Sequence, residues 1–183
     1  MFDALVFAVY DCGFIARCTK EIGDATSARI ENILTLINEC KYGIHDISRT
    51  EPSKGSGLPR FNMPLELGLF LGAARSGRRE KRCLVLDREQ YRYQHYISDI
   101  AGQDIEAHGD DPRTAIRRVR DWLRTVAVPH GVSLPGGTRM IERYDAFTEQ
   151  LPTQCARRHL TLEELTFADF SAMVSGWLLE NPW

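Results

Sequence analysis

The segment of residues 42–74 constrains the fold of this chain more than any other part of the sequence. We expect a short strand at residues 42–47, and a loop rich in Gly, Pro and Ser follows at residues 48–61. A helix is then expected to begin at Asn62-Met63-Pro64, because proline is favoured in the first turn of a helix. Long loops inside a compact domain are commonly functional. We therefore expect this segment to form a pocket for a small molecule, with a nucleotide as the first candidate.

Alternation of strands and helices along the chain predicts an α/β fold. The runs at residues 4–9 and 83–86 are continuously apolar, which is typical of strands covered on both faces of a parallel sheet. Apolar residues at helical spacing separate the strands, and such strand–helix–strand units form right-handed crossovers. The predicted fold is a mostly parallel sheet flanked by helices. Its strands are expected at residues 4–9, 42–47, 83–86 and 103–107. One helix is expected to end near residue 40, a second to begin near residue 62, and a third to cover residues 111–126.

The best candidate for a domain boundary is the segment of residues 128–137, which is rich in Pro and Gly. We therefore expect an α/β domain at residues 1–127 and a C-terminal helical extension at residues 128–183. Thr161 and Glu164 match a capping box at the start of the last helix. The apolar face of that helix should pack on the first domain or on another chain, which predicts a homo-oligomer or a partner protein. This face comprises Phe167, Phe170, Met173, Val174 and Trp177.

Composition excludes several classes of function. The formal net charge is −2, which argues against a dedicated nucleic-acid binder. No apolar run approaches the roughly 18 residues of a membrane span, so we expect a cytoplasmic protein without membrane contact. Five scattered cysteines without a CxxC pair indicate neither a zinc site nor a disulfide framework. The GxGxxG, P-loop and GxSxG motifs are absent, and no metal or resident cofactor is expected.

Polar residues follow the predicted strands at the edge where parallel sheets bind ligands, the carboxyl ends of the strands. The loop and the helix start after the second strand reach the same edge. Arg49 and Arg60 are candidates for binding phosphate, with ordinary surface solvation as the alternative. The candidate substrate-binding residues are Tyr10, Asp11 and Cys12 after the first strand, Ser48, Arg49, Arg60 and Asn62 after the second, and Asp87, with Arg88 beside it, after the third.

Two carboxylates are candidates for catalysis, and each also has a structural interpretation. Glu66, near the start of the helix, could act as a nucleophile or stabiliser at an anomeric carbon, or could cap the helix N-terminus if Met63 is the N-cap. Asp46 could orient a ribose hydroxyl or assist as a general acid or base, or could bond to its own loop. His45 is expected to be a packed, hydrogen-bonded strand residue without a catalytic role.

Three of these features together resemble the Toll/interleukin-receptor-like and nucleoside 2-deoxyribosyltransferase-like group. They are the apolar first strand, the strand exit Ile44-His45-Asp46-Ile47-Ser48-Arg49 and the helix start Asn62-Met63-Pro64-Leu65-Glu66-Leu67-Gly68. The resemblance covers residues 1–126 and implies a flavodoxin-like sheet. It also implies that Glu66 attacks or stabilises the N-glycosidic carbon of NAD or a nucleoside, with Asp46 as its acidic partner and residues 49–61 as a mobile loop. The strand exit at residues 10–13 and the C-terminal helices depart from the pattern of the group.

Two functions follow from the resemblance. The first is an N-glycosidase or N-glycosyl transferase that acts on NAD or a nucleoside, as some members of the group do in bacterial immunity. The second is a nucleotide-sensing or self-assembly module without catalysis. Glu66 beside Asp46 favours the first function, and the apolar C-terminal helix and the long loop favour the second.

Overall fold

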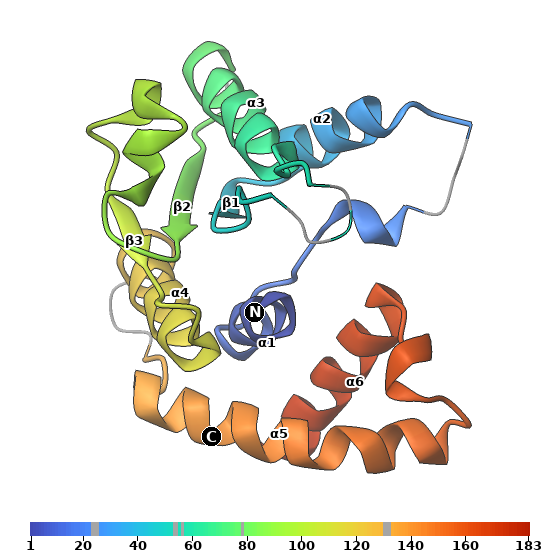
Figure 1. The fold of residues 1–183 in the computed structure, drawn as a ribbon. Coiled ribbons are helices and arrows are strands. Elements are labelled where there is room, and N and C mark those ends of the chain that lie inside the picture. The colour runs from blue at the N-terminus through green and yellow to red at the C-terminus, as the bar shows by residue number, and fades with distance from the viewer. Residues whose placement is uncertain (23–25, 53–54, 56, 78, 130–132) are drawn as a thin grey trace. The chain divides into compact units, whose positions relative to one another are not determined.

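The structure is a computed structural model that describes residues 1–22, 26–52, 55, 57–77, 79–129 and 133–183 (Figure 1). Its strands are short, and helices account for most of the ordered backbone. In chain order the elements are α1 (Phe2–Asp11), η1 (Thr19–Glu21), α2 (Arg29–Glu39), β1 (Tyr42–Asp46), α3 (Asn62–Ser76), β2 (Arg82–Asp87), η2 (Arg92–His95), η3 (Ser98–Ile100), β3 (Ile105–Ala107), α4 (Pro112–Val126), α5 (Gly137–Arg157), η4 (Leu162–Glu164) and α6 (Phe167–Glu180).

The chain divides into two compact units. The helical unit comprises Met1–Gly23 and Pro112–Trp183, and the sheet unit comprises Asp24–Asp111. This grouping differs from the division at residue 127 that the sequence led us to expect. The difference arises because α1 and α4 pack against each other and against α5, so both belong with the C-terminal helices.

The described residues of the sheet unit form three parallel strands in the order β1-β2-β3, which confirms the α/β class. Tyr42 of β1 lies beside Arg82 of β2, and Asp46 lies beside Leu86 at the other end of the pair. β2 pairs with β3 from Val85 opposite Ile105 onward. Because all three strands run in the same direction, their carboxyl ends share one edge. The predicted strands at residues 42–47, 83–86 and 103–107 are therefore confirmed.

Small apolar clusters hold the sheet unit together. One joins Ile47, Leu67 and Val85, and another places Phe70 of α3 against Ile33 and Ile37 of α2. The C-terminal end of α2 is closed by the ammonium group of Lys81, which donates to the carbonyls of Ile37 and Cys40. The basic segment around residue 81 thus contributes a helix cap, where a cation is favoured by the free carbonyls and the helix dipole.

The predicted first strand is wrong, because residues 4–9 belong to α1. The buried residues Ala4, Ala8 and Asp11 recur at helical spacing on α1, and Phe7 lies on the same side. A segment that is apolar all round fits a buried helix as well as a buried strand, and periodicity cannot separate the two. Packing against α4, α5 and α6 selects the helix.

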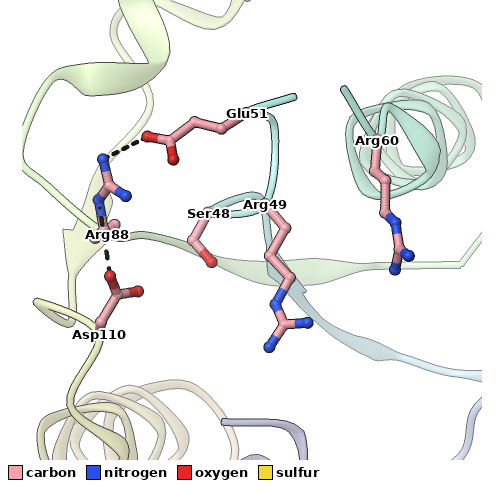
Figure 2. A pocket seen from close by; sticks show the side chains of 6 residues that line it. All are labelled: Ser48, Arg49, Glu51, Arg60, Arg88 and Asp110. Atoms are coloured by element: carbon pink, nitrogen blue, oxygen red, sulfur yellow. Dashed lines mark hydrogen bonds and ion pairs between the residues drawn. The ribbon is translucent and has the colours of Figure 1, made fainter. Parts of the chain in front are cut away.

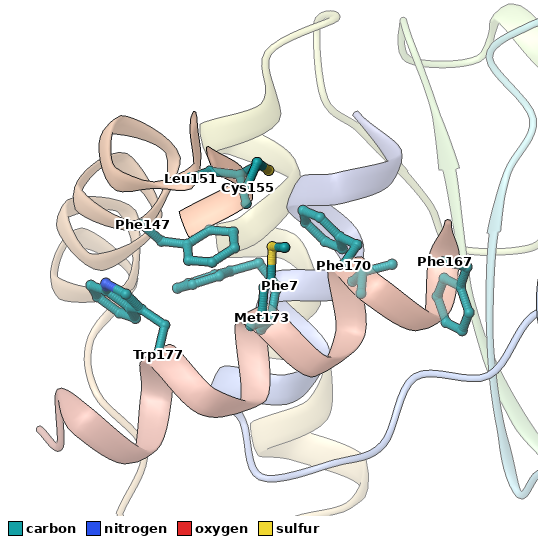
Figure 3. Packing of buried hydrophobic residues seen from close by; sticks show 10 residues of the cluster. Phe7, Phe147, Leu151, Cys155, Phe167, Phe170, Met173 and Trp177 are labelled. Atoms are coloured by element: carbon teal, nitrogen blue, oxygen red, sulfur yellow. The ribbon is translucent and has the colours of Figure 1, made fainter. Parts of the chain in front are cut away.

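The apolar face of α6 is covered within the helical unit. Phe170, Met173 and Trp177 pack with Phe7 of α1 and Phe147 of α5 in one buried cluster (Figure 3). The exposed apolar face that led us to expect a partner protein is therefore not present. The helix begins at Phe167, and its own capping box is formed by Thr166 and Asp169, whereas the predicted box at residues 161–164 closes η4.

Candidate functional site

A pocket of about 370 Å³ lies where the strands of the sheet unit end. Ser48, Arg49 and Glu51 follow β1, Arg88 follows β2, and Asp110 follows β3. Arg60 completes the lining from the residues that precede α3. Figure 2 shows these six side chains around the opening. The edge predicted from the sequence therefore carries a pocket, and its volume falls in the range of roughly 300–1,000 Å³ that is usual for ligand sites.

The three arginines of the pocket are in different electrostatic states. Arg88 donates from Nη2 to Oε1 of Glu51 at 2.6 Å. Arg49 and Arg60 are exposed and have no hydrogen bond or ion pair within the described part of the chain, and Figure 2 shows no bond from either guanidinium. Three guanidinium groups against the carboxylates of Glu51 and Asp110 leave the lining with a net charge of +1. The pocket is therefore electropositive, with two cations available to a ligand.

A buried network fixes the loop that carries the first half of the pocket. Asp87 is fully buried at the end of β2 and accepts from Nη2 of Arg92 at 2.6 Å and from the hydroxyl of Tyr96 at 2.9 Å. The same Arg92 donates to the carbonyl of Ser48 at 2.7 Å and to Oγ1 of Thr50 at 3.2 Å. We call these three residues, Asp87, Arg92 and Tyr96, the loop clamp. It sets the backbone of residues 48–50 and thereby the direction in which the pocket side chains leave it.

Asp46 is held by a buried histidine. Its Oδ1 lies 3.3 Å from Nε2 of His108 and accepts from the backbone N–H of Ser48 at 3.0 Å. Nδ1 of His108 accepts from the N–H of Asp110, so in the neutral ring Nε2 carries the proton and donates to Asp46. Burial acts to raise the pKa of Asp46, but the bonds from His108 and Ser48 outweigh it and leave the pKa below its usual range. Asp46 is therefore an oriented carboxylate at the strand edge.

Glu66 lies in the second turn of α3, which overturns its interpretation as a helix cap. The helix begins at Asn62 with Phe61 as the N-cap, and its first turn holds no acidic residue. Glu66 is half-buried and has no hydrogen bond within the residues that the structure describes. Burial raises its pKa, and the charge of Arg29 opposes that rise. Neither Glu66 nor Asn62, which is exposed at the start of the helix, is among the residues lining the pocket.

The predicted role of residues 10–12 as a strand exit is wrong, because they belong to α1 and its C-cap in the helical unit. Tyr10 packs against the apolar cluster of that unit. Asp11 is buried and bound by Nε of Arg143 at 3.0 Å. Burial raises the pKa of the Cys12 thiol to about 12, which leaves it protonated and unreactive at neutral pH. Each of the three therefore has a structural role in the helical unit.

His45 is buried, as expected, but it is not hydrogen-bonded. Neither ring nitrogen has a partner within the described residues, and the ring packs edge-on against Phe70 with centroids 5.2 Å apart. Burial lowers the pKa of His45 to about 4. The neutral ring behaves here as an apolar side chain of the sheet core.

Several residues that hold the site in place were not predicted from the sequence, or were predicted in another role. Asp87 was expected to face a substrate, yet it is the buried centre of the loop clamp. Arg92, Tyr96 and His108 lie in segments without a motif, and their contacts with Thr50, Ile47 and Asp46 span 42 to 62 residues of sequence. A usable signal was present only for Glu51 and Asp110, because both lie close to the C-terminal ends of predicted strands.

Comparisons with known family models, curated proteins and solved structures find no match. Among the described residues, no group of three or more His, Cys, Asp or Glu side chains is arranged to hold a metal ion. None of the helices in the same part of the chain has both the length and the apolar character needed to cross a membrane.

Proposed function

We propose that the sheet unit binds a small molecule carrying a phosphate group, with a nucleotide as the leading candidate. The observation that carries this proposal is the pair of guanidinium groups of Arg49 and Arg60, which bind no other described residue and line a pocket at the carboxyl edge of a parallel sheet. Parallel sheets bind ligands at this edge. Guanidinium groups bind phosphate oxygens through charge-assisted hydrogen bonds that are frequently bidentate.

The rest of the lining supports an ester of phosphate more than a purely anionic ligand. Glu51 and Asp110 offer carboxylate oxygens that accept hydrogen bonds from hydroxyl or amino groups. Ser48 adds a hydroxyl that both donates and accepts. A ligand with a phosphate at one end and hydroxyl groups beside it, as in a nucleotide or sugar phosphate, uses both halves of the pocket.

Titration calorimetry with the four nucleoside 5′-monophosphates, NAD and the matching nucleosides tests this proposal. We expect at least one phosphorylated ligand to bind, and the matching nucleoside to bind at least tenfold more weakly. Arg49→Ala and Arg60→Ala should each weaken binding about tenfold, since each removes a charged hydrogen bond of about 1.5 kcal/mol. Arg75→Ala, which removes an exposed arginine outside the pocket lining, is the matched control. Equal binding by all four proteins would refute the proposal.

A second candidate function is cleavage or transfer at an N-glycosidic bond, with Glu66 as the reacting carboxylate and Asp46 as its partner. It is favoured by a half-buried Glu66 that lacks a hydrogen bond in the described chain and has a raised pKa. Such perturbed carboxylates are enriched at catalytic sites. Chromatographic detection of free base after incubation with NAD or nucleotides tests it. Release that persists unchanged in both Glu66→Gln and Asp46→Asn would exclude this assignment.

A further inference from the structure

Arg88 differs from the other two arginines of the pocket because it already forms ion pairs with carboxylates of the protein. Its Nη2 donates to Glu51 at 2.6 Å, and its Nε donates to Glu89 at 3.0 Å and lies 3.8 Å from Oδ2 of Asp110. Figure 2 shows Arg88 between Glu51 and Asp110, while no dashed line joins Arg49 or Arg60 to any of the other residues drawn. The pocket thus has an open cationic part and a neutralised part.

The open part matches the charge of one phosphate monoester. Such a group carries about −1.5 to −2 near neutral pH, which Arg49 and Arg60 together balance. A second phosphate of the same ligand would need a further cation, and the remaining one in the lining is Arg88. There it would compete with the carboxylate of Glu51 for the guanidinium and would be repelled by Glu51 and Asp110 together. Repulsion between like charges at ion-pair distances weakens the binding of a ligand several-fold even in water.

We propose that Glu51 is a specificity-determining residue that restricts this pocket to ligands with a single phosphate group. By neutralising Arg88, it removes the third cation that a diphosphate or triphosphate requires. The inference rests on the proposed phosphate-binding function and narrows its ligand to phosphate monoesters.

Glu51 fits this role better than the other carboxylates around Arg88. Its Oε1 makes the shortest ion pair to Arg88 and also lies 3.9 Å from Nη1 of Arg92. Asp110 approaches Arg88 only to 3.8 Å, and Glu89, at 3.0 Å, does not line the pocket. The hydrogen bond from Arg88 holds the pKa of Glu51 below its ordinary value, so Glu51 stays charged at neutral pH. Thr50, the residue before Glu51, is buried and bound by Arg92, which places Glu51 beside the pocket.

Inorganic phosphate and pyrophosphate test the inference without assumptions about the rest of the ligand. Their dissociation constants are measured by chemical-shift titration of backbone amides at constant ionic strength and without divalent cations. In the wild type we expect pyrophosphate to bind no more tightly than phosphate, despite its larger charge. In Glu51→Gln we expect pyrophosphate to bind about fivefold more tightly than in the wild type, because one like charge near it is removed. Phosphate should improve by about twofold or less.

Two further variants make the result specific. Asp110→Asn should shift the ratio of the two constants in the same direction by a smaller factor, because Asp110 lies farther from Arg88. Glu89→Gln, which removes a partner of Arg88 that does not line the pocket, should change the ratio less than Glu51→Gln does, because Glu51 still neutralises Arg88. All substituted residues are exposed or at the pocket rim, and circular dichroism checks their folding.

Tighter wild-type binding of pyrophosphate, with a ratio that neither Glu51→Gln nor Asp110→Asn changes, would overturn the role of Glu51 and leave phosphate binding intact. A different result, in which neither anion shifts the amides of Ser48 and Arg49 and Arg49→Ala changes nothing, would overturn phosphate binding itself and the inference with it.

Discussion

Each unit of this chain contains an Asp–Arg pair with a buried aspartate, and the two pairs have different roles. In the helical unit Asp11 of α1 binds Arg143 of α5, whose Nη1 also donates to the carbonyl of Asn181 after α6. In the sheet unit Asp87 binds Arg92, whose Nη2 also donates to the carbonyl of Ser48 in the pocket loop. The first pair connects three helices of one core. The second shapes a binding surface.

The role of such a pair depends on the acceptors that the remaining N–H groups of the arginine reach. A guanidinium has five N–H groups in a fixed fork, so it can hold a carboxylate and still bind other acceptors. Arg143 directs its spare donor to the backbone at the end of a helix and lies over the ring of Trp177. Arg92 directs its spare donors to a loop that supplies Ser48, Arg49 and Glu51 to the pocket. Stability and binding should therefore respond differently when each pair is broken.

The largest expected effect is on stability in the helical unit. Asp11→Ala leaves the buried charge of Arg143 without its carboxylate partner, which costs about 3–5 kcal/mol. Urea unfolding followed by circular dichroism measures this loss. Asp145→Ala is the matched control, because it breaks the exposed pair with Arg113 and should cost less than about 1 kcal/mol. A loss for Asp11→Ala as small as that of the control would mean that the buried pair does not stabilise the helical core.

The free energy of unfolding as a function of pH tests the consequence of burying His45, whose ring has no hydrogen bond within the described residues. His45 has a pKa near 6.5 when unfolded and about 4 when folded, so the unfolded chain binds more protons between these values. The contribution of His45 to the free energy of unfolding should be complete above pH 6.5. It should fall by about 3 kcal/mol as the pH drops to 4, at about 1.4 kcal/mol per pKa unit.

His45→Leu should remove this part of the pH dependence, since leucine has no proton to gain. Urea unfolding of both proteins at several pH values from 4 to 7 provides the comparison. If the two curves run parallel, His45 does not contribute to acid sensitivity.

The next effect is smaller and concerns ligand binding, which should depend on Arg92 of the sheet unit and not on Arg143 of the helical unit. Arg92→Lys keeps a positive charge beside Asp87 but loses the fork that also holds Ser48 and Thr50. We expect about tenfold weaker binding of a phosphorylated ligand, or about 1.4 kcal/mol, with a similar or smaller loss of stability. Arg143→Lys, the equivalent change in the helical unit, should lower stability without changing binding. Unchanged binding in Arg92→Lys would show that the loop clamp does not shape the pocket.

The smallest effect concerns a surface cap of the helical unit. Oγ1 of Thr166 accepts from the N–H of Asp169 at the start of α6. Thr166→Ala should cost about 1 kcal/mol in urea unfolding and leave ligand binding as it is. Thr148, whose hydroxyl bonds within α5, offers a control at which alanine should cost less. A cost for Thr166→Ala below that of Thr148→Ala would contradict the capping role.

Sequence reasoning succeeded where local signals and the fold agree. The strand at residues 42–47 and the helix start at Asn62 follow from residue type and turn chemistry, and the strand ends predicted Ser48, Arg49 and Arg60 at one edge. Residues 4–9 failed because an apolar run carries no period, so the neighbours in space decide between helix and strand. That error placed Tyr10, Asp11 and Cys12 in the site.

The remaining misses depend on side-chain contacts and helix boundaries that no sequence motif marks. Asp87 sits at a strand end in a position typical of a ligand-binding acid, and only the presence of Arg92 and Tyr96 shows that it is already occupied. The capping interpretation of Glu66 failed because it required Met63 as the N-cap, whereas the N-cap is Phe61 and Glu66 falls in the second turn. The exact boundary of an element is hard to predict from sequence.

The central claim is that the sheet unit, at its pocket, binds a phosphate-bearing ligand while the helical unit serves as a scaffold. Amide chemical shifts during titration with a nucleoside 5′-monophosphate test it most directly. The account predicts saturable shifts that are largest at Ser48, Arg49, Arg60, Arg88 and Asp110, and no comparable shifts at Phe147, Phe170 or Trp177. Absent shifts at the pocket residues, or larger ones in the helical unit, would contradict it.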